Sequence, residues 1–131
     1  MSIINTINDL NALKHGKPAT LEQIDKAQND LNVIFADDYK EYLLTFGVIS
    51  ACGIELTGVS SVDRLSVVNV TQRERERISN FPKDAYVIEN LAIESIIIFQ
   101  NQSGNIYSIS ETGKQEWICS SLAEYIHQAN S

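Results

Sequence analysis

The chain has few of the residues from which catalytic and metal sites are most often built. Its 131 residues include two cysteines, two histidines and two prolines. His15 and His127 lie at opposite ends of the chain and belong to no metal-ligand spacing. No Gly-x-Ser-x-Gly sequence presents a serine as a nucleophile. The sequence therefore predicts a protein that is not an enzyme, with no catalytic residues, no metal and no cofactor.

Cysteine pairing is also unsupported by the sequence. Cys52 and Cys119 are far apart in the chain and neither belongs to a paired cysteine motif. Structural disulfides are rare in the reducing cytosol, where isolated cysteines usually behave as small buried hydrophobic residues. We therefore expect two reduced thiols in the core rather than a disulfide or a metal site.

Long hydrophobic runs are absent as well. No apolar run reaches the roughly 18 residues needed to span a bilayer, and the first nine residues, MSIINTIND, lack a basic region followed by a long apolar one. We expect a cytoplasmic protein with no membrane association.

Positive charge is scarce. Ten Lys and Arg residues stand against 17 Asp and Glu, which gives a formal net charge of −7 and a sequence pI of about 4.7. Phosphate contacts need positive charge, so this balance argues against direct nucleic-acid binding. It suits a basic protein partner, because complementary charge raises association rates. The alternative is that the acidity only keeps the protein soluble.

Apolar residues, by contrast, are plentiful. They make up 44% of the chain, charged residues make up 21%, and the length falls within the usual range of one domain. There is no repeat of fixed period and no low-complexity tract. We expect one domain over residues 1–131.

The first half of the sequence predicts helices. Apolar residues recur at intervals of three and four over residues 2–13. Thr20 and Gln23 form a capping box at the start of a helix over 21–31. The apolar stripe of that helix is expected to contain Leu21, Ile24, Ala27 and Leu31. A helix over 38–46 follows, with Asp37 as its cap and Gly47 as its stop.

The second half predicts mainly strands. A strand and turn begin near Ile54, a final helix starts at Ser120 or Ser121, and further strands are expected at 86–91, 96–100, 105–110 and 116–118. The strands at 96–100 and 105–110 should form a hairpin. The fold class is therefore α+β, an antiparallel β-sheet packed against N-terminal helices and a C-terminal helix.

Residues 65–78 permit two interpretations. The β-branched first part, 65–70, is typical of a strand. Thr71 and Glu74 instead match a capping box that would start a helix. The arginines at 73, 75 and 77 alternate with glutamates and indicate a solvated helix face rather than a nucleic-acid site.

Two other features have both a structural and a functional interpretation. Gly53 and Gly58 have the spacing of a phosphate-binding loop, but Val59 and Ser60 stand where that loop needs Lys and Ser or Thr. Large aromatic rings often anchor a protein partner. The spacing of most of the large aromatic residues in this chain favours a place in the core over a partner-binding role. They are Trp117 and the tyrosines at 39, 42, 86, 107 and 125.

A family resemblance rests on residues 34–43, which read IFADDYKEYL, with a helix before them and a helix, a glycine and a strand after them. This order resembles the SUKH superfamily of the Smi/Knr type, whose link reads hydrophobic, Leu, Pro, two acidic residues, Tyr, Lys, any residue, hydrophobic, Leu. Phe35 and Ala36 depart from that pattern at its Leu and Pro. The similarity resumes at 70–75, 81–91 and 103–109, and covers roughly residues 20–127.

The resemblance implies a binding function. Bacterial relatives commonly act as immunity proteins, which bind and neutralise a polymorphic or contact-dependent toxin, often a nuclease. Eukaryotic relatives of the Smi/Knr type imply the alternative of a regulatory adaptor or scaffold. The expected partner is a cognate protein toxin, most simply a basic nuclease domain. Candidate partner-binding carboxylates lie in the later strands and loops: Glu55, Asp63, Glu89, Glu94, Glu111 and Glu116.

Overall fold

The computed structural model describes residues 1–130, which form five α-helices and seven strands. The helices are α1 (Ile3–Asn8), α2 (Leu21–Leu31), α3 (Asp37–Phe46), α4 (Val67–Arg77) and α5 (Leu122–Ala129), with a 3-10 helix η1 at Asp63–Leu65. The strands are β1 (Lys14–His15), β2 (Ile49–Ala51), β3 (Ile54–Leu56), β4 (Tyr86–Asn90), β5 (Ile97–Gln100), β6 (Ile106–Ile109) and β7 (Gln115–Cys119).

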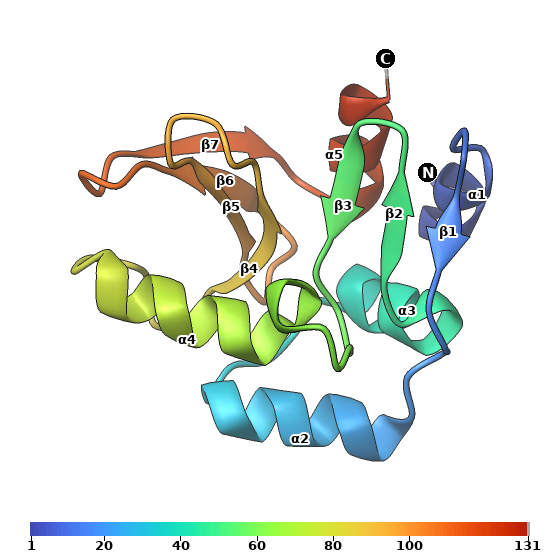
Figure 1. The fold of residues 1–131 in the computed structure, drawn as a ribbon, viewed down its shortest axis with the longest axis horizontal. Helices are drawn as coiled ribbons and strands as arrows, with labels where there is room; N and C mark the ends of the chain where they lie inside the picture. The colour runs from blue at the N-terminus through green and yellow to red at the C-terminus, as the bar shows by residue number, and fades with distance from the viewer. Residues whose placement is uncertain (131) are drawn as a thin grey trace.

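The strands form two antiparallel sheets, one in the order β1-β2-β3 and one in the order β4-β5-β6-β7 (Figure 1). The α+β prediction is confirmed, although the sequence suggested a single sheet. Thr57 joins the two. Its backbone N–H donates to the carbonyl of Ile88 over 2.9 Å and its hydroxyl donates to the carbonyl of Val87 over 2.8 Å. The chain after β3 therefore lies along the outer edge of β4.

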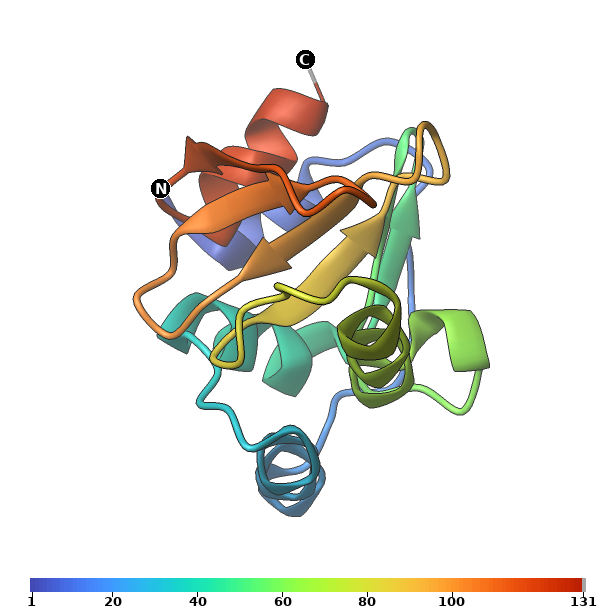
Figure 2. The ribbon, with the colours of Figure 1, turned by 90° about the vertical axis from the view of Figure 1, so that its left-hand side faces the viewer.

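Both faces of the four-stranded sheet carry buried apolar residues. One face packs with Val70, Ile78 and Phe81 from α4 and the segment after it. The opposite face packs with α1, α3 and α5. Figure 2 shows α4 against one side of this sheet and α5 on the other. The sheet can be buried on both sides because its side chains alternate, as Val87 and Ile88 do between the two apolar clusters.

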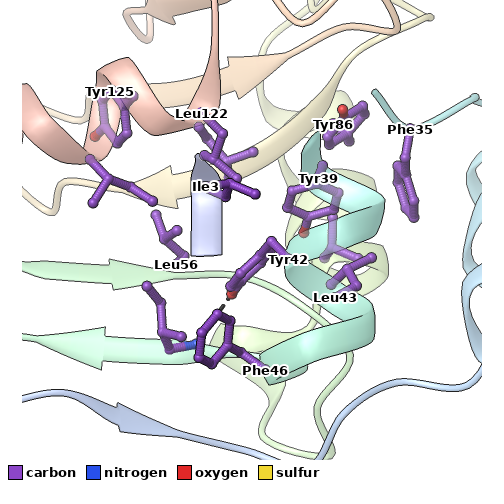
Figure 3. Packing of buried hydrophobic residues seen from close by; sticks show 14 of the residues in the cluster. Ile3, Phe35, Tyr39, Tyr42, Leu43, Phe46, Leu56, Tyr86, Leu122 and Tyr125 are labelled. Atoms are coloured by element: carbon purple, nitrogen blue, oxygen red, sulfur yellow. Dashed lines mark hydrogen bonds between the residues drawn. The ribbon is translucent and has the colours of Figure 1, made fainter. Parts of the chain in front are cut away.

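Aromatic residues fill the core where α3 meets β4 (Figure 3). Each buried hydroxyl there has a partner, as a buried polar group requires. Tyr42 donates to the carbonyl of Thr57 over 2.7 Å and accepts from the backbone N–H of Ile49 over 3.2 Å. Tyr86 accepts from the backbone N–H of Ala36 over 2.9 Å. This last bond uses an amide hydrogen that a proline at position 36 would lack.

The first helix is shorter than its periodicity predicts. α1 ends at Asn8, and Lys14 and His15 form β1 opposite Ser50 and Ile49. The apolar spacing continues beyond the helix because Leu10, which lies in a turn, is also buried. Asn8 and Asp9 favour caps and turns over helix interiors, so the helix stops there.

The caps of α2 and α3 agree with the sequence only in part. Thr20 and Gln23 form the predicted capping box, with bonds of 3.1 and 3.0 Å. Leu21 is 67% exposed and lies outside the buried stripe. Asp37 is not the cap of α3: the N-cap is Ala36, and it makes no side-chain capping bond. Asp37 and Asp38 lie instead in the first turn, where the helix dipole favours negative charge.

The ambiguous segment is a helix. Ser66 caps α4 by accepting from the backbone N–H of Asn69 over 3.2 Å. The predicted capping box at Thr71 is wrong, because Thr71 lies inside the helix and its hydroxyl accepts from the backbone N–H of Val87 over 2.9 Å. The β-branched residues are tolerated in this helix because Val67 and Val70 are buried. Packing here outweighs intrinsic propensity.

The C-terminal elements follow the prediction closely. β5 and β6 form the expected antiparallel hairpin. Of the two candidate caps, Ser121 begins α5 by accepting from the backbone N–H of Glu124 over 3.2 Å. None of the helices within residues 1–130 is long and apolar enough to cross a membrane.

Candidate partner-binding surface

Five of the six candidate carboxylates are exposed, and four of them have a basic neighbour. On and after β3, Arg64 donates to Glu55 over 3.3 Å, and Arg73 pairs with Asp63. On the β6–β7 hairpin, Lys114 lies 3.3 Å from Glu116, and Arg77 lies 4.0 Å from Glu111. Glu94 is exposed in the β4–β5 loop. Exposed pairs of this kind contribute little to stability, so these carboxylates remain available to a partner.

Glu89 departs from the prediction of a surface carboxylate, because the residue is only 6% exposed. Its two carboxylate oxygens accept from the backbone N–H of Glu55 over 2.8 Å and from the Tyr125 hydroxyl over 2.5 Å. Burial raises the pKa of Glu89 above its usual 4.5, although both hydrogen bonds oppose this shift. Glu89 therefore holds β3, β4 and α5 together and does not face a partner.

A signal for the burial of Glu89 was present in the sequence. Residues 85–88 read AYVI, a continuous apolar run typical of a strand that is covered on both faces. A carboxylate that directly continues such a run is expected to lie between the same two layers.

Trp117 is the exception to the expectation that most of the large aromatic residues lie in the core, since it is 59% exposed on β7. Its indole N–H donates to the side chain of Asn105 over 3.3 Å. It lies opposite Tyr107 in the sheet, and the Tyr107 ring stacks on that of Phe99 at a centroid distance of 5.2 Å. Phe81 continues this aromatic row under α4, so the row runs from the core to the exposed sheet edge.

The tyrosines bear out the expectation that most aromatic residues belong to the core. Four are buried and Tyr107 is half-buried. The buried ones are Tyr39, Tyr42, Tyr86 and Tyr125. For Trp117, the polar residues Gln115 and Glu116 just before it were a sign of an exposed strand.

Charge is distributed unevenly along the chain. Residues 64–83 carry five of the ten Lys and Arg residues and only two of the 17 Asp and Glu. This segment contains α4, on which Arg73 and Arg77 are exposed. The acidic excess therefore belongs to the rest of the chain, which holds 15 acidic and five basic residues. A basic partner is expected to approach that larger acidic part first.

The thiols and the titratable side chains form no evident reaction centre within residues 1–130. Cys119 is buried as predicted, whereas Cys52 is exposed and lies outside the core. In the same part of the chain, no group of three or more His, Cys, Asp and Glu side chains is arranged to hold a metal ion. The exposed groups of the candidate partner-binding surface can make hydrogen bonds, ion pairs and aromatic contacts.

The structure defines an α+β protein whose distinctive exposed groups are carboxylates and one aromatic side chain at a sheet edge. A family model described as "SMI1-KNR4 cell-wall" (SUKH_5) matches residues 1–130. The chain belongs to this SUKH family. No curated protein matches the sequence. Membership is compatible with an immunity role or with a regulatory role of the Smi/Knr type, and it suggests a protein partner.

Proposed function

We propose that this protein is an immunity protein, which binds a cognate polymorphic or contact-dependent bacterial toxin and neutralises it by covering part of its surface. The observation that carries the proposal is the family match over residues 1–130. The net charge of −7 supports a basic partner, and a nuclease domain has this character where it holds nucleic acid. In this proposal the protein acts in the cytoplasm as a binding partner and carries out no reaction.

The partner-binding surface that we propose uses the exposed carboxylates Glu55, Asp63, Glu94, Glu111 and Glu116. A standard protein interface buries about 1,600 Å² and has a few strong anchors inside a polar rim. Rim carboxylates mainly raise the association rate. Arg64, Arg73 and Lys114 already pair with three of them, so a basic partner would exchange one exposed ion pair for another at small cost.

A Smi/Knr-type regulatory adaptor is the second candidate, and the cell-wall description of the matching family favours it. Such an adaptor would form complexes with several signalling proteins. An immunity protein would instead form one tight complex with one toxin.

Co-expression with the toxin encoded beside this protein's own gene tests the immunity proposal. We expect the wild-type protein to restore growth and to co-purify with that toxin. Failure of both would contradict the proposal. Stable co-purification with several unrelated signalling proteins would support the adaptor instead.

Charge-neutralising variants test the proposed surface. We expect the combined Glu→Gln and Asp→Asn changes at the five positions to slow association about tenfold or more at low salt and to flatten its salt dependence. The matched control makes the same type of change at five exposed carboxylates of α2 and α3, which are Glu22, Asp25, Asp30, Asp37 and Glu41. Association rates that are unchanged by the five substitutions would exclude this surface.

A further inference from the structure

The outer edge of β7 is the open side of the four-stranded sheet. Within residues 1–130 no strand pairs with it (Figure 1). The opposite edge, at β4, is covered by the hydrogen bonds of Thr57 to Val87 and Ile88. An unpaired edge presents a row of free N–H and C=O groups to any extended chain nearby.

The ladder between β6 and β7 shows which backbone groups face outward. Ser110 donates its N–H to the carbonyl of Lys114 over 3.0 Å, and its own carbonyl accepts from the N–H of Gly113 over 2.9 Å. The backbone groups of Ser110 therefore face β7, and Ser110 and Lys114 occupy the position of a hydrogen-bonded pair. Such pairs alternate with non-hydrogen-bonded pairs along an antiparallel ladder. Ile109 with Gln115 and Tyr107 with Trp117 are therefore non-hydrogen-bonded pairs. The N–H and C=O groups of Gln115 and Trp117 point away from β6, toward the open edge.

The features that usually protect an edge strand lie at the two ends of β7. Lys114 precedes the strand, and the register shifts between Ile106 and Tyr107, which face its last residues. Between these ends the register from Gln115 to Trp117 is regular. No proline interrupts the strand. The central part of β7 is therefore geometrically able to accept a further strand.

The side chains of β7 offer different chemistry on each face. Trp117 presents an exposed indole whose N–H is already held by Asn105, so its orientation is fixed before a partner arrives. Glu116 points to the opposite face and is exposed there. A strand added to β7 would set one side chain beside Trp117 and its immediate neighbour beside Glu116.

We propose that β7 binds an extended segment of the partner protein by strand addition, and that this segment alternates basic residues with apolar or arginine residues. The basic residues lie beside Glu116, and the apolar or arginine residues lie beside the Trp117 ring. Backbone hydrogen bonds to Gln115 and Trp117 supply affinity for any extended segment, and the alternating side chains of the bound segment supply specificity. This inference rests on the proposed function, because the partner is taken to be the basic toxin.

Charge decides between this partner and a second copy of the chain. Antiparallel pairing of two β7 strands about Trp117 would place the two Glu116 side chains diagonally on one face, about 7–8 Å apart. Each copy would also bring a net charge of −7. A basic segment meets neither repulsion, so the edge suits it better.

Proline at position 115 tests the proposal, because the Gln115 N–H faces outward and proline removes that donor without removing a β6–β7 hydrogen bond. We expect Gln115→Pro to weaken toxin binding at least about tenfold, with Gln115→Ala, which keeps the N–H, within about twofold of wild type. Trp117→Ala should also weaken binding. Urea unfolding and circular dichroism establish that each variant is folded.

Hydrogen exchange of the wild-type protein is a second test, and it does not depend on the folding of any variant. In the complex, the amides of Gln115 and Trp117 should exchange at least about tenfold more slowly than in the free protein. Unchanged exchange at both amides, or wild-type affinity in folded Gln115→Pro, would overturn the inference while leaving the immunity proposal standing. A dimer of the free protein that Gln115→Pro abolishes would also overturn it, in favour of a second copy.

If the wild-type protein binds no toxin, the proposed function is contradicted but strand addition to β7 is not. A synthetic peptide of alternating lysine and valine then replaces the toxin as the probe. Slower exchange at Gln115 and Trp117 with this peptide, but not with one of alternating glutamate and valine, supports strand addition of a basic segment. No change with either peptide overturns it.

Discussion

The two neighbouring aspartates at the start of α3 have different roles. Asp37 is exposed. The carboxylate of Asp38 accepts from the backbone N–H of Leu122 over 2.7 Å and from the side chain of Gln100 over 3.0 Å. Asp38 thus satisfies an otherwise unpaired amide at the start of α5 and links that helix to α3 and β5. The dipole of its own helix accounts for only part of this role.

We expect Asp38→Ala to lower the free energy of unfolding by about 1–3 kcal/mol, because it leaves the Leu122 amide without its acceptor and the buried Gln100 amide group with only the Gly104 carbonyl. Asp37→Ala is the matched control and should cost less than about 1 kcal/mol, the usual size of a helix-dipole contribution. Urea denaturation of both variants measures the difference. Equal losses would contradict the role assigned to Asp38.

Glu89 makes stability depend on pH. Burial raises its pKa in the folded protein above its usual 4.5, so the folded state binds the proton more tightly than the unfolded state does. Its contribution to stability is therefore complete below the unfolded pKa and is lost as the pH rises through the folded pKa. We expect the stability of the wild type relative to Glu89→Gln to fall as the pH rises from below the usual pKa of 4.5 through the raised pKa of the folded state.

Urea denaturation across that pH range measures this difference. Glu94→Gln, at an exposed carboxylate, controls for the loss of one negative charge. The expectation for Glu89 fails if the wild type gains stability relative to Glu89→Gln as the pH rises. The adjacent hydroxyl of Tyr125 stays protonated throughout, since burial and the Glu89 carboxylate raise its pKa.

At the scale of elements, the end of α3 depends on Gly47. Its φ is 72°, and a Cβ there would lie 1.9 Å from the carbonyl oxygen of Lys17. Gly53, in the β2–β3 turn, has a φ of 82° but open space around it. Both glycines have a positive φ, and of the two only Gly47 also has a close backbone contact.

This pair gives a controlled prediction. Gly53→Ala should cost about 1–2 kcal/mol, the usual strain of a left-handed residue that has a Cβ. Gly47→Ala should cost at least twice as much, because the backbone of Lys17 must also move away from α3. Thermal unfolding of both variants measures the difference. A similar loss in the two would show that the contact with Lys17 relaxes without penalty.

At the scale of the whole molecule, the reactivity of the two thiols distinguishes the folded from the unfolded protein. Cys52 is exposed, whereas Cys119 belongs to the main apolar cluster, and burial raises the pKa of its thiol. We expect a thiol reagent to modify one cysteine quickly in the native protein and both in urea. Mass spectrometry of Cys52→Ser and Cys119→Ser variants assigns them. Fast modification of Cys119 under native conditions would contradict the packing of β7 against α5.

Much of the fold could be predicted because local sequence patterns reflect which residues are buried and where helices and turns begin and end. The Thr20 capping box, the stop at Gly47 and the β5–β6 hairpin are each decided by a few neighbouring residues. The candidate carboxylates were only partly predictable, since exposure depends on what covers a strand. The single domain over 1–131 and the toxin-binding role of these residues stay predictions.

The sequence by itself determined the helical start, the antiparallel strands, the acidic charge and the family, because periodicity, caps and composition are local or additive properties. Tertiary structure decided the rest. It turned the β-branched residues before Thr71 into a helix, buried Glu89 between β3, β4 and α5, and left Trp117 at an open edge. Each outcome depends on which distant segment covers the residue. Neighbouring residues can indicate burial or exposure, but they do not indicate which segment provides the cover.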